Sequence, residues 1–111
     1  MTGAAFFLCV AAVAIDGDTL RCEGLGKVRL ARIDTPELSE PGGAEARAAL
    51  IALIGGRDVH CRQIDALPQT RAFESTDRWG RIVARCSAGR RDLGKALRRA
   101  GIASEWPAKR G

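Results

Sequence analysis

Carboxylates are concentrated in one short part of the sequence, where they could hold a cation. The stretch AIDGDTLRCEGLGKVRLARIDTPEL, residues 14–38, and the two residues after it contain six acidic side chains: Asp16, Asp18, Glu23, Asp34, Glu37 and Glu40. Two carboxylates brought close together repel each other and raise each other's pKa unless a cation neutralises them. Hard divalent ions remove that cost and prefer oxygen ligands, including backbone carbonyls and water. Calcium tolerates irregular geometry, so we expect Ca²⁺ rather than Mg²⁺ at a loop-rich site of this kind.

Two segments of this stretch have the spacing that such a site needs. In DGDT, Asp16 and Asp18 flank a turn glycine, and in RIDTPE, Asp34 lies at a predicted strand end with Glu37 just beyond it. If the two strand ends converge, Asp18 and Asp34 meet. For DGD taken alone, turn chemistry is the better explanation, because Asp and Gly are common in hairpin turns. Both segments in one short chain favour the cation site.

Basic residues dominate the rest of the chain. Residues 1–70 contain 7 Lys and Arg against 9 Asp and Glu, whereas residues 71–111 contain 11 against 4. The net charge of +5 favours a polyanionic partner such as nucleic acid, although charge runs of this kind are often only solvated surfaces. An acidic first part could hold a cation, and a basic second part could hold phosphates.

The elements that must position these residues alternate in a simple order. Hydrophobic periodicity and turn residues predict three strands, a helix, two strands and a second helix. The predicted strands are 6–15, 19–23, 27–33, 57–64 and 81–86, and the predicted helices are 44–54 and 91–101. We expect one α+β domain over residues 1–111, mainly β, built as a five-stranded barrel with packed helices.

The N-terminal apolar run and the cysteines leave alternatives open. Residues 4–15 read either as a first buried strand, which we favour, or as the apolar part of a signal peptide. The run is too short to span a membrane. The four cysteines, Cys9, Cys22, Cys61 and Cys86, form no C-x-x-C pair, so a zinc site is not expected. Cys61 and Cys86 fall in strands that could be neighbours, where a disulfide and two free buried thiols are equally compatible with the sequence.

Four motifs in order resemble the staphylococcal nuclease (thermonuclease) family: VAIDGDTL, VRLARIDTPE, TDRWGR and LRRAGIA. The resemblance covers nearly the whole chain, from about Cys9 to Trp106. It implies an OB-type five-stranded barrel with two or three helices, in agreement with the periodicity. It also implies a calcium-dependent nuclease that hydrolyses DNA and RNA with little sequence specificity and leaves 3′-phosphates.

The resemblance assigns roles to residues that match the motifs. Asp18 and Asp34 match the carboxylate ligands of Ca²⁺, and Thr35 matches the residue whose backbone carbonyl binds the ion. Asp16 matches a residue that supports this site. Glu37 matches the general base that activates water.

The remaining assignments concern the substrate. Arg29 and Arg81 match the two arginines that bind the scissile phosphate, which suits the planar guanidinium group. Arg78 and Trp79 match the basic residue and the aromatic that line the nucleotide pocket; tryptophan replaces the usual tyrosine, so stacking remains without the hydroxyl.

Several of these side chains could instead have purely structural or surface roles. Arg81 could simply pair with Asp77, and Trp79 could be a core aromatic. Arg32 and His60 are expected to have structural or surface roles, and Trp106 lies near a second pocket aromatic of the family, but out of register.

Two functions of different class follow. The chain is either an active nuclease or a catalytically weak nucleic-acid-binding or interaction module on the same barrel. We favour the enzyme because Asp18, Arg29, Asp34, Glu37 and Arg81 are all present. The expected partners are single-stranded or locally melted DNA and RNA, with no membrane and a monomeric state. Family and cysteines favour a secreted or periplasmic location.

Overall fold

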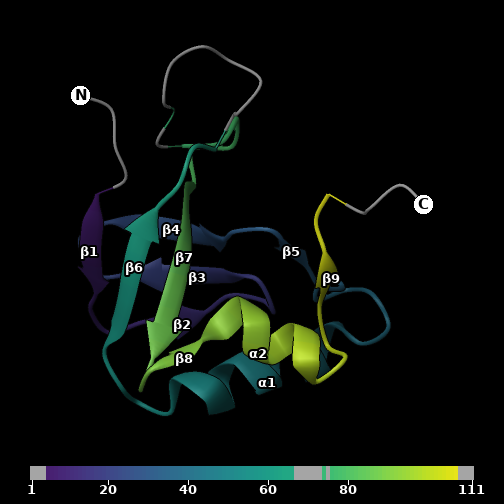
Figure 1. The fold of residues 1–111 in the computed structure, drawn as a ribbon. Coiled ribbons are helices and arrows are strands. Elements are labelled where there is room, and N and C mark those ends of the chain that lie inside the picture. The colour runs from purple at the N-terminus through teal and green to yellow at the C-terminus, as the bar shows by residue number, and fades with distance from the viewer. Residues whose placement is uncertain (1–4, 67–73, 75, 108–111) are drawn as a thin grey trace.

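The computed structural model describes residues 5–66, 74 and 76–107, and within them it is mainly β with two helices (Figure 1). The larger strands are β1 (Phe6–Cys9), β3 (Thr19–Cys22), β4 (Gly26–Leu30), β6 (Val59–Gln63) and β7 (Ile82–Ala88). The short strands are β2 (Val13–Ala14), β5 (Ile33–Asp34), β8 (Arg91–Asp92) and β9 (Ser104–Glu105). The helices are α1 (Gly43–Ile54) and α2 (Leu93–Arg99). The predicted order of elements, the mainly β class and the presence of two helices are confirmed.

The large sheet follows the order β1-β6-β7-β4-β3-β2, with β8 paired to β7. All of its neighbours on this path are antiparallel except β4 and β7, which run parallel. The two ends of the path, β1 and β2, are consecutive segments of one apolar run. The ladder itself is not closed, but the Cys9–Cys22 disulfide and a 3.0 Å hydrogen bond from the Glu23 N–H to the Val10 carbonyl connect the end of β1 to the end of β3, the neighbour of β2.

The predicted single strand at residues 6–15 is wrong in one respect, because the structure divides it into β1 and β2. Ala11 adopts a left-handed backbone conformation with φ of 51°. This turn allows β1 to pair with β6 while β2 pairs with β3. A single straight strand could not reach both partners.

The predicted strand at residues 27–33 is also divided. β4 ends at Leu30, and Arg32 has φ of 63°, which turns the chain out of the large sheet. Residues Ile33 and Asp34 then form β5, which pairs with β9 in a separate two-stranded sheet. Periodicity alone cannot distinguish this break from a continuous strand, and β9 was not expected. Smaller differences affect the ends of β6 and β7.

Alternation along the strands separates a core face from an outer face. Leu20, Val28 and Ala84 point inward and are fully buried, whereas their neighbours Arg21, Lys27 and Arg85 are exposed. The helices cover one end of the sheet, with Leu50 of α1 and the leucines of α2 in the same core (Figure 1). Helical spacing predicts one apolar face with Leu93, Ala96, Leu97 and Ala100. The first three are buried, but Ala100 is exposed because α2 ends at Arg99.

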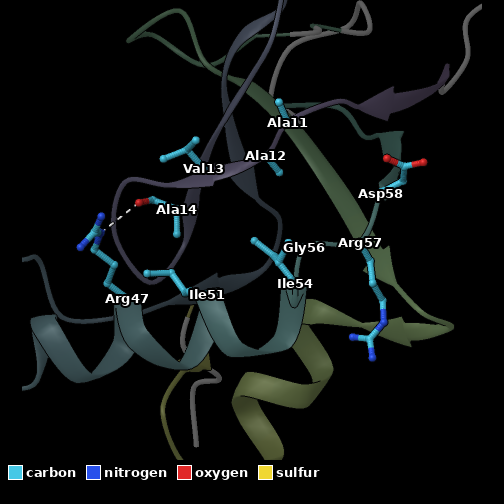
Figure 2. Close-up of a pocket in the computed structure, with 10 residues that line it drawn as sticks. All are labelled: Ala11, Ala12, Val13, Ala14, Arg47, Ile51, Ile54, Gly56, Arg57 and Asp58. Atoms are coloured by element: carbon cyan, nitrogen blue, oxygen red, sulfur yellow. Dashed lines mark hydrogen bonds between the residues drawn. The ribbon is translucent and has the colours of Figure 1, made fainter.

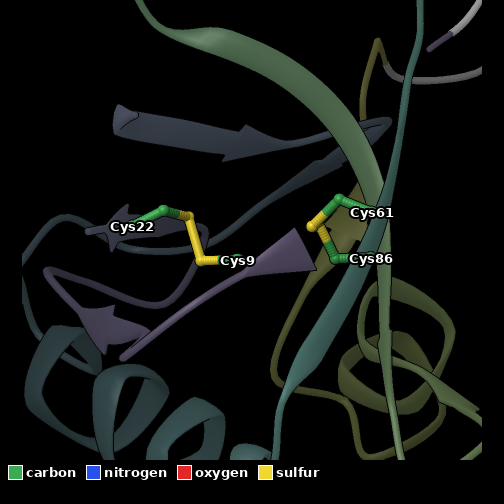
Figure 3. Close-up of a disulfide and its surroundings, with 4 residues drawn as sticks. All are labelled: Cys9, Cys22, Cys61 and Cys86. Atoms are coloured by element: carbon green, nitrogen blue, oxygen red, sulfur yellow. A yellow bond between two sulfur atoms is a disulfide. The ribbon is translucent and has the colours of Figure 1, made fainter. Parts of the chain in front are cut away.

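All four cysteines are paired in disulfides (Figure 3). Cys61 and Cys86 are directly opposite each other on β6 and β7, so these two strands are neighbours as expected. The partnership of Cys9 with Cys22 joins β1 to β3 and was not anticipated. Disulfides persist in oxidising compartments, and two of them are consistent with an extracellular location. Across the part of the chain that the structure describes, no helix is long and apolar enough to cross a membrane. The sequence DALPQTRAFEST, residues 65–76, predicts a surface loop, and it falls largely outside the described residues.

Candidate functional site

A tight turn between β2 and β3 places Asp18 at the edge of the core. The Asp16 carboxylate accepts a 3.0 Å hydrogen bond from the Asp18 N–H, and the Ile15 N–H donates to the Thr19 carbonyl at 2.9 Å. Gly17 is buried in this turn, and a Cβ there would lie 2.6 Å from Thr35 Oγ1 and 2.7 Å from Ala46 Cβ. The turn therefore packs against the segment that carries Asp34 and Thr35, and only glycine fits between them.

Asp18 and Asp34 converge on one guanidinium. Arg29 Nη2 lies 3.4 Å from Asp18 Oδ2 and 3.7 Å from Asp34 Oδ1. Arg29 Nη1 also donates to the Leu30 carbonyl at 2.6 Å, which fixes the side chain. β3 and β4 place these groups together, because Thr19, next to Asp18, is the cross-strand partner of Arg29. The convergence expected of the two strand ends is thus present in the structure.

Besides Arg29, two threonines hold the Asp18 carboxylate. Its Oδ1 accepts from the Thr19 hydroxyl at 3.1 Å, and its Oδ2 accepts from the Thr35 N–H at 3.2 Å. The residue is only 6% exposed. Burial raises the pKa of Asp18 above its ordinary value; Arg29 opposes the rise, Asp16 adds to it, and the Thr35 N–H opposes it. The positive charge of Arg29 therefore helps to keep the buried Asp18 carboxylate ionised.

The donor chemistry around Asp18 and Asp34 fits a hard cation. Thr35 Oγ1 is buried and has no hydrogen-bond partner, and it lies beside Gly17 at the same turn. Buried hydroxyls normally have partners, so this orphaned oxygen, on the residue whose N–H contacts Asp18, is a candidate ligand. In residues 5–66, 74 and 76–107, however, no group of three or more His, Cys, Asp or Glu side chains is arranged to hold a metal ion. A calcium ion would need backbone carbonyls and water to complete its 6–8 oxygen ligands.

Glu37 lies in a different environment, on the exposed loop that leads into α1. Its side chain is exposed and, within the described residues, forms no hydrogen bond or ion pair. Its backbone is held firmly, since the Glu37 N–H donates to Glu40 Oε1 at 2.7 Å and the Glu40 N–H donates to the Glu37 carbonyl at 2.8 Å. Gly43 packs so closely on the Glu37 carbonyl that an added Cβ would collide with it. The loop therefore fixes where the Glu37 side chain begins and leaves its carboxylate open to solvent.

Arg81 is fixed by a carboxylate in its own turn. Asp77 Oδ2 accepts from Arg81 Nε at 2.8 Å, and Asp77 Oδ1 accepts from the backbone N–H groups of Trp79 and Arg81 at 3.0 and 2.9 Å. Among the described residues, Asp77 is the only carboxylate paired with Arg81. The two terminal nitrogens of Arg81 thus stay available while its orientation is set. The ion pair with Asp77, considered above as an alternative role for Arg81, is thus formed, and it is compatible with phosphate binding.

The TDRWGR turn also presents its aromatic to solvent. Trp79 is 72% exposed, so it is not the core aromatic considered as an alternative. The guanidinium carbons of Arg81 and Arg78 lie 5.3 and 5.7 Å from the centroid of its ring. Such an aromatic flanked by cations can stack on a base and attract the adjoining phosphate.

The segment after α2 runs beside Asp34. Ser104 in β9 is the cross-strand partner of Asp34, and a hollow of about 470 Å³ lies next to them, lined also by Thr35 and Glu40. Trp106 is 56% exposed, and its backbone N–H donates to the Arg32 carbonyl at 2.9 Å. The Arg32 and His60 side chains are exposed, and neither lies in the cluster around Asp18.

A second hollow, of about 310 Å³, lies between the β1–β2 connection and α1 (Figure 2). It is lined mainly by alanine and isoleucine side chains, and Arg47 at its rim donates from Nε to the Ala14 carbonyl at 3.0 Å. None of the site residues expected from the sequence lines it, so this hollow is not part of the candidate site.

Four supporting residues were missed as site residues by the sequence analysis. Gly17 and Gly43 make room for neighbouring atoms, and Asp77 and Glu40 hold Arg81 and Glu37. A signal exists only for Asp77, whose position four residues before Arg81 in a short turn allows an ion pair. The two glycines and Glu40 act through contacts that spacing does not reveal.

A family model described as "Staphylococcal nuclease homologue" matches residues 27–110. The match includes Arg29, Asp34, Glu37 and Arg81, but it begins after Asp18. No curated protein matches the chain.

Proposed function

Because the chain belongs to the staphylococcal nuclease homologue family, we propose that it is a calcium-dependent nuclease that hydrolyses phosphodiester bonds of DNA and RNA with little sequence specificity. The observation that carries the proposal is the convergence of Asp18 and Asp34 on Arg29, at 3.4 and 3.7 Å, beside the unpartnered Thr35 hydroxyl. Two carboxylates, an orphaned oxygen and an arginine in one place suit a site for a cation and a phosphate.

Each residue has a distinct task in the proposed reaction. Asp18, Asp34 and Thr35 hold Ca²⁺, with Asp16 supporting the turn. When bound, Ca²⁺ stabilises the negative charge that develops on the phosphate oxygens. Glu37 accepts a proton from water, and the resulting hydroxide attacks phosphorus.

The guanidiniums act on the phosphate itself. Arg29 and Arg81 donate to its non-bridging oxygens, where charge accumulates in the transition state. The bond from phosphorus to the 5′ oxygen breaks, the leaving oxygen takes up a proton, and a 3′-phosphate remains. Arg78 and Trp79 bind the neighbouring nucleotide through charge and stacking, neither of which reads the base sequence.

A nucleic-acid-binding module without strong activity is the second candidate. Two observations favour it: Arg29 is engaged by two carboxylates, and the Glu37 side chain has no partner in the described structure. A chain with this geometry could bind a strand without activating water. Product analysis separates the two functions.

The test is incubation of the purified protein with heat-denatured DNA, in calcium or in chelator. We expect cleavage only with calcium, and a loss of about 10²–10³-fold in kcat for Arg81→Ala, as for the removal of one transition-state donor. Arg99→Ala is the matched control, because Arg99 is an exposed arginine on α2. Binding without cleavage would establish the module instead, and equal cleavage in chelator would reject calcium dependence.

Glu37→Gln tests the proton acceptor. We expect kcat to fall by about 10²–10⁴-fold with little change in KM. An intact kcat with a raised KM would remove Glu37 from the chemical step.

A further inference from the structure

The six strands on the path of the large sheet carry positive charge on their outer face and contain no carboxylate, and the one acidic residue of the attached strand β8, Asp92, caps α2. The six strands on the path of this sheet contain five basic residues and no Asp or Glu: Arg21, Lys27, Arg29, Arg62 and Arg85. The alternation of the strands puts all five on the side opposite the core. One of them, Arg29, belongs to the proposed active site.

Two of these arginines are directly opposite each other. Arg62 in β6 and Arg85 in β7 are cross-strand partners, and both are exposed. In the part of the chain that the structure describes, neither forms an ion pair. Like charges in this arrangement destabilise a sheet, and a bound anion removes that repulsion.

An exposed aromatic side chain lies next to this pair of arginines. Phe6 in β1 is the cross-strand partner of Arg62 and is 79% exposed. The Arg62 guanidinium carbon lies 5.9 Å from the centroid of the Phe6 ring. A flat ring beside two guanidiniums can stack on an unpaired base while the arginines bind its phosphates.

The group formed by Arg85, Arg62 and Phe6 is continuous with the proposed active site. Arg29 in β4 is the cross-strand partner of Val83 in β7, so both side chains are on the outer face. Alternation from Val83 puts Arg85 on the same face, and Arg81 precedes it by four residues, or about 13 Å of extended chain. A nucleic-acid strand bound at Arg29 and Arg81 could thus extend along β7 to Arg85, Arg62 and Phe6.

We propose that Arg85, Arg62 and Phe6 form a second binding site for single-stranded nucleic acid, which holds the strand several nucleotides away from the cleavage point. Single strands suit this site because stacking on Phe6 needs an unpaired base. The inference rests on the proposed function, since it extends the same substrate. It predicts that long oligonucleotides bind more tightly than short ones.

Binding is measured by fluorescence anisotropy in chelator, with labelled oligothymidylates of about 4 and about 12 nucleotides, within the range of site sizes known for OB folds. We expect R62A/R85A to weaken binding of the longer strand at least tenfold and to reduce its salt dependence by about 1.4 in log–log slope. Phe6→Ala should weaken binding of the longer oligonucleotide by at least about fivefold. Binding and calcium-dependent cleavage of the short strand should not change.

The matched control is K95A/R99A, which removes two exposed charges from α2. This helix packs on the core side of β7, since Leu93 and Leu97 share the core with Ala84 and Cys86. An equal loss in the control would mean that net charge alone matters and would overturn the proposal. So would unchanged binding of the longer strand by R62A/R85A variants whose thermal unfolding matches the wild type.

Two further outcomes distinguish this inference from the proposed function. Tight binding of polyglutamate through the same residues would assign the face to an acidic protein and overturn the nucleic-acid site. Cleavage of the short strand with no advantage for the longer one would refute the second site alone. Absence of both binding and cleavage by the wild type would refute the second site together with the proposed function.

Discussion

Asp18 and Glu37 are carboxylates of one proposed site, yet the fold treats them in opposite ways. Asp18 is 6% exposed, accepts hydrogen bonds from Thr19 and Thr35, and faces Arg29. Glu37 is exposed, and its loop holds only its backbone. The two environments suit two tasks. A ligand of a cation benefits from a fixed, desolvated position, whereas a proton acceptor needs access to water.

The comparison also predicts where a substitution will act. Changes around Asp18 disturb packed atoms and should alter stability and calcium binding together. Changes around Glu37 should alter catalytic rate with little effect on folding, because an exposed loop can adjust.

The largest effect is expected for Gly17→Ala. The new Cβ would meet Thr35 Oγ1 and Ala46 Cβ at 2.6 and 2.7 Å, and both neighbours are buried. Overpacking of this kind costs about 1–3 kcal/mol of folding free energy. We expect this loss in denaturant unfolding, and loss of calcium binding by isothermal titration calorimetry.

Gly94→Ala is the matched control for this substitution. A Cβ at Gly94 would make contacts no closer than 3.4 Å, and alanine favours the helix, so stability should be kept or raised. If Gly17→Ala also left stability and calcium binding unchanged, the tight packing of the Asp18 turn would be refuted.

Gly43→Ala applies the same change to the Glu37 loop. Its Cβ would collide with the Glu37 carbonyl, so Glu37 must shift. Because a misplaced catalytic group loses much of its rate, we expect kcat to fall by about 10²-fold. Thermal unfolding should change less than in Gly17→Ala. A larger loss of stability than of rate would show that this loop is as rigid as the Asp18 turn.

Asp18→Asn should increase stability at neutral pH while removing calcium binding. Burial raises the pKa of Asp18, so the folded state binds the proton more tightly than the unfolded state. Stability from this group is therefore greatest at low pH and is lost as pH rises through the folded pKa.

The test compares the variant and the wild type by denaturant unfolding in chelator. The variant should be more stable at pH 7, and its advantage should shrink as pH falls toward the ordinary Asp pKa of about 3.9. Asp34→Asn is the control, because a side chain that is 54% exposed should change stability by less than about 0.5 kcal/mol. A less stable Asp18→Asn would mean that the pair with Arg29 outweighs the cost of burial.

The smallest effect is expected for Glu40→Ala, which removes the acceptor for the Glu37 N–H. We expect kcat to fall by a few fold, with calcium affinity unchanged. Glu40→Gln keeps an oxygen acceptor and should restore the rate. Equal rates for the alanine and glutamine variants would show that Glu40 does not position Glu37.

Much of the fold could be predicted because it follows from local patterns. Alternation along β3, β6 and β7 and the helical spacing of α1 identified these elements, with errors mainly at their ends. The breaks at Ala11 and Arg32 could not be predicted, since each depends on a left-handed residue that carries no glycine signal. Both are required by pairing with strands far away in the sequence.

The candidate site divides in the same way. The sequence by itself determined the residue types: carboxylates at two strand ends, arginines in the strand-like segments, and a family motif set that indicates a nuclease-type domain. These features are chemical and local, so the sequence alone is enough to identify them.

Only the tertiary structure decided the contacts among them. It placed Arg29 between Asp18 and Asp34, paired Cys9 with Cys22, and set Gly43 against the Glu37 carbonyl. It also placed Arg62 and Arg85, which are far apart in the sequence, directly opposite each other on two neighbouring strands. Such contacts depend on strand register and packing distance, and neither is encoded in the spacing of residues along the sequence.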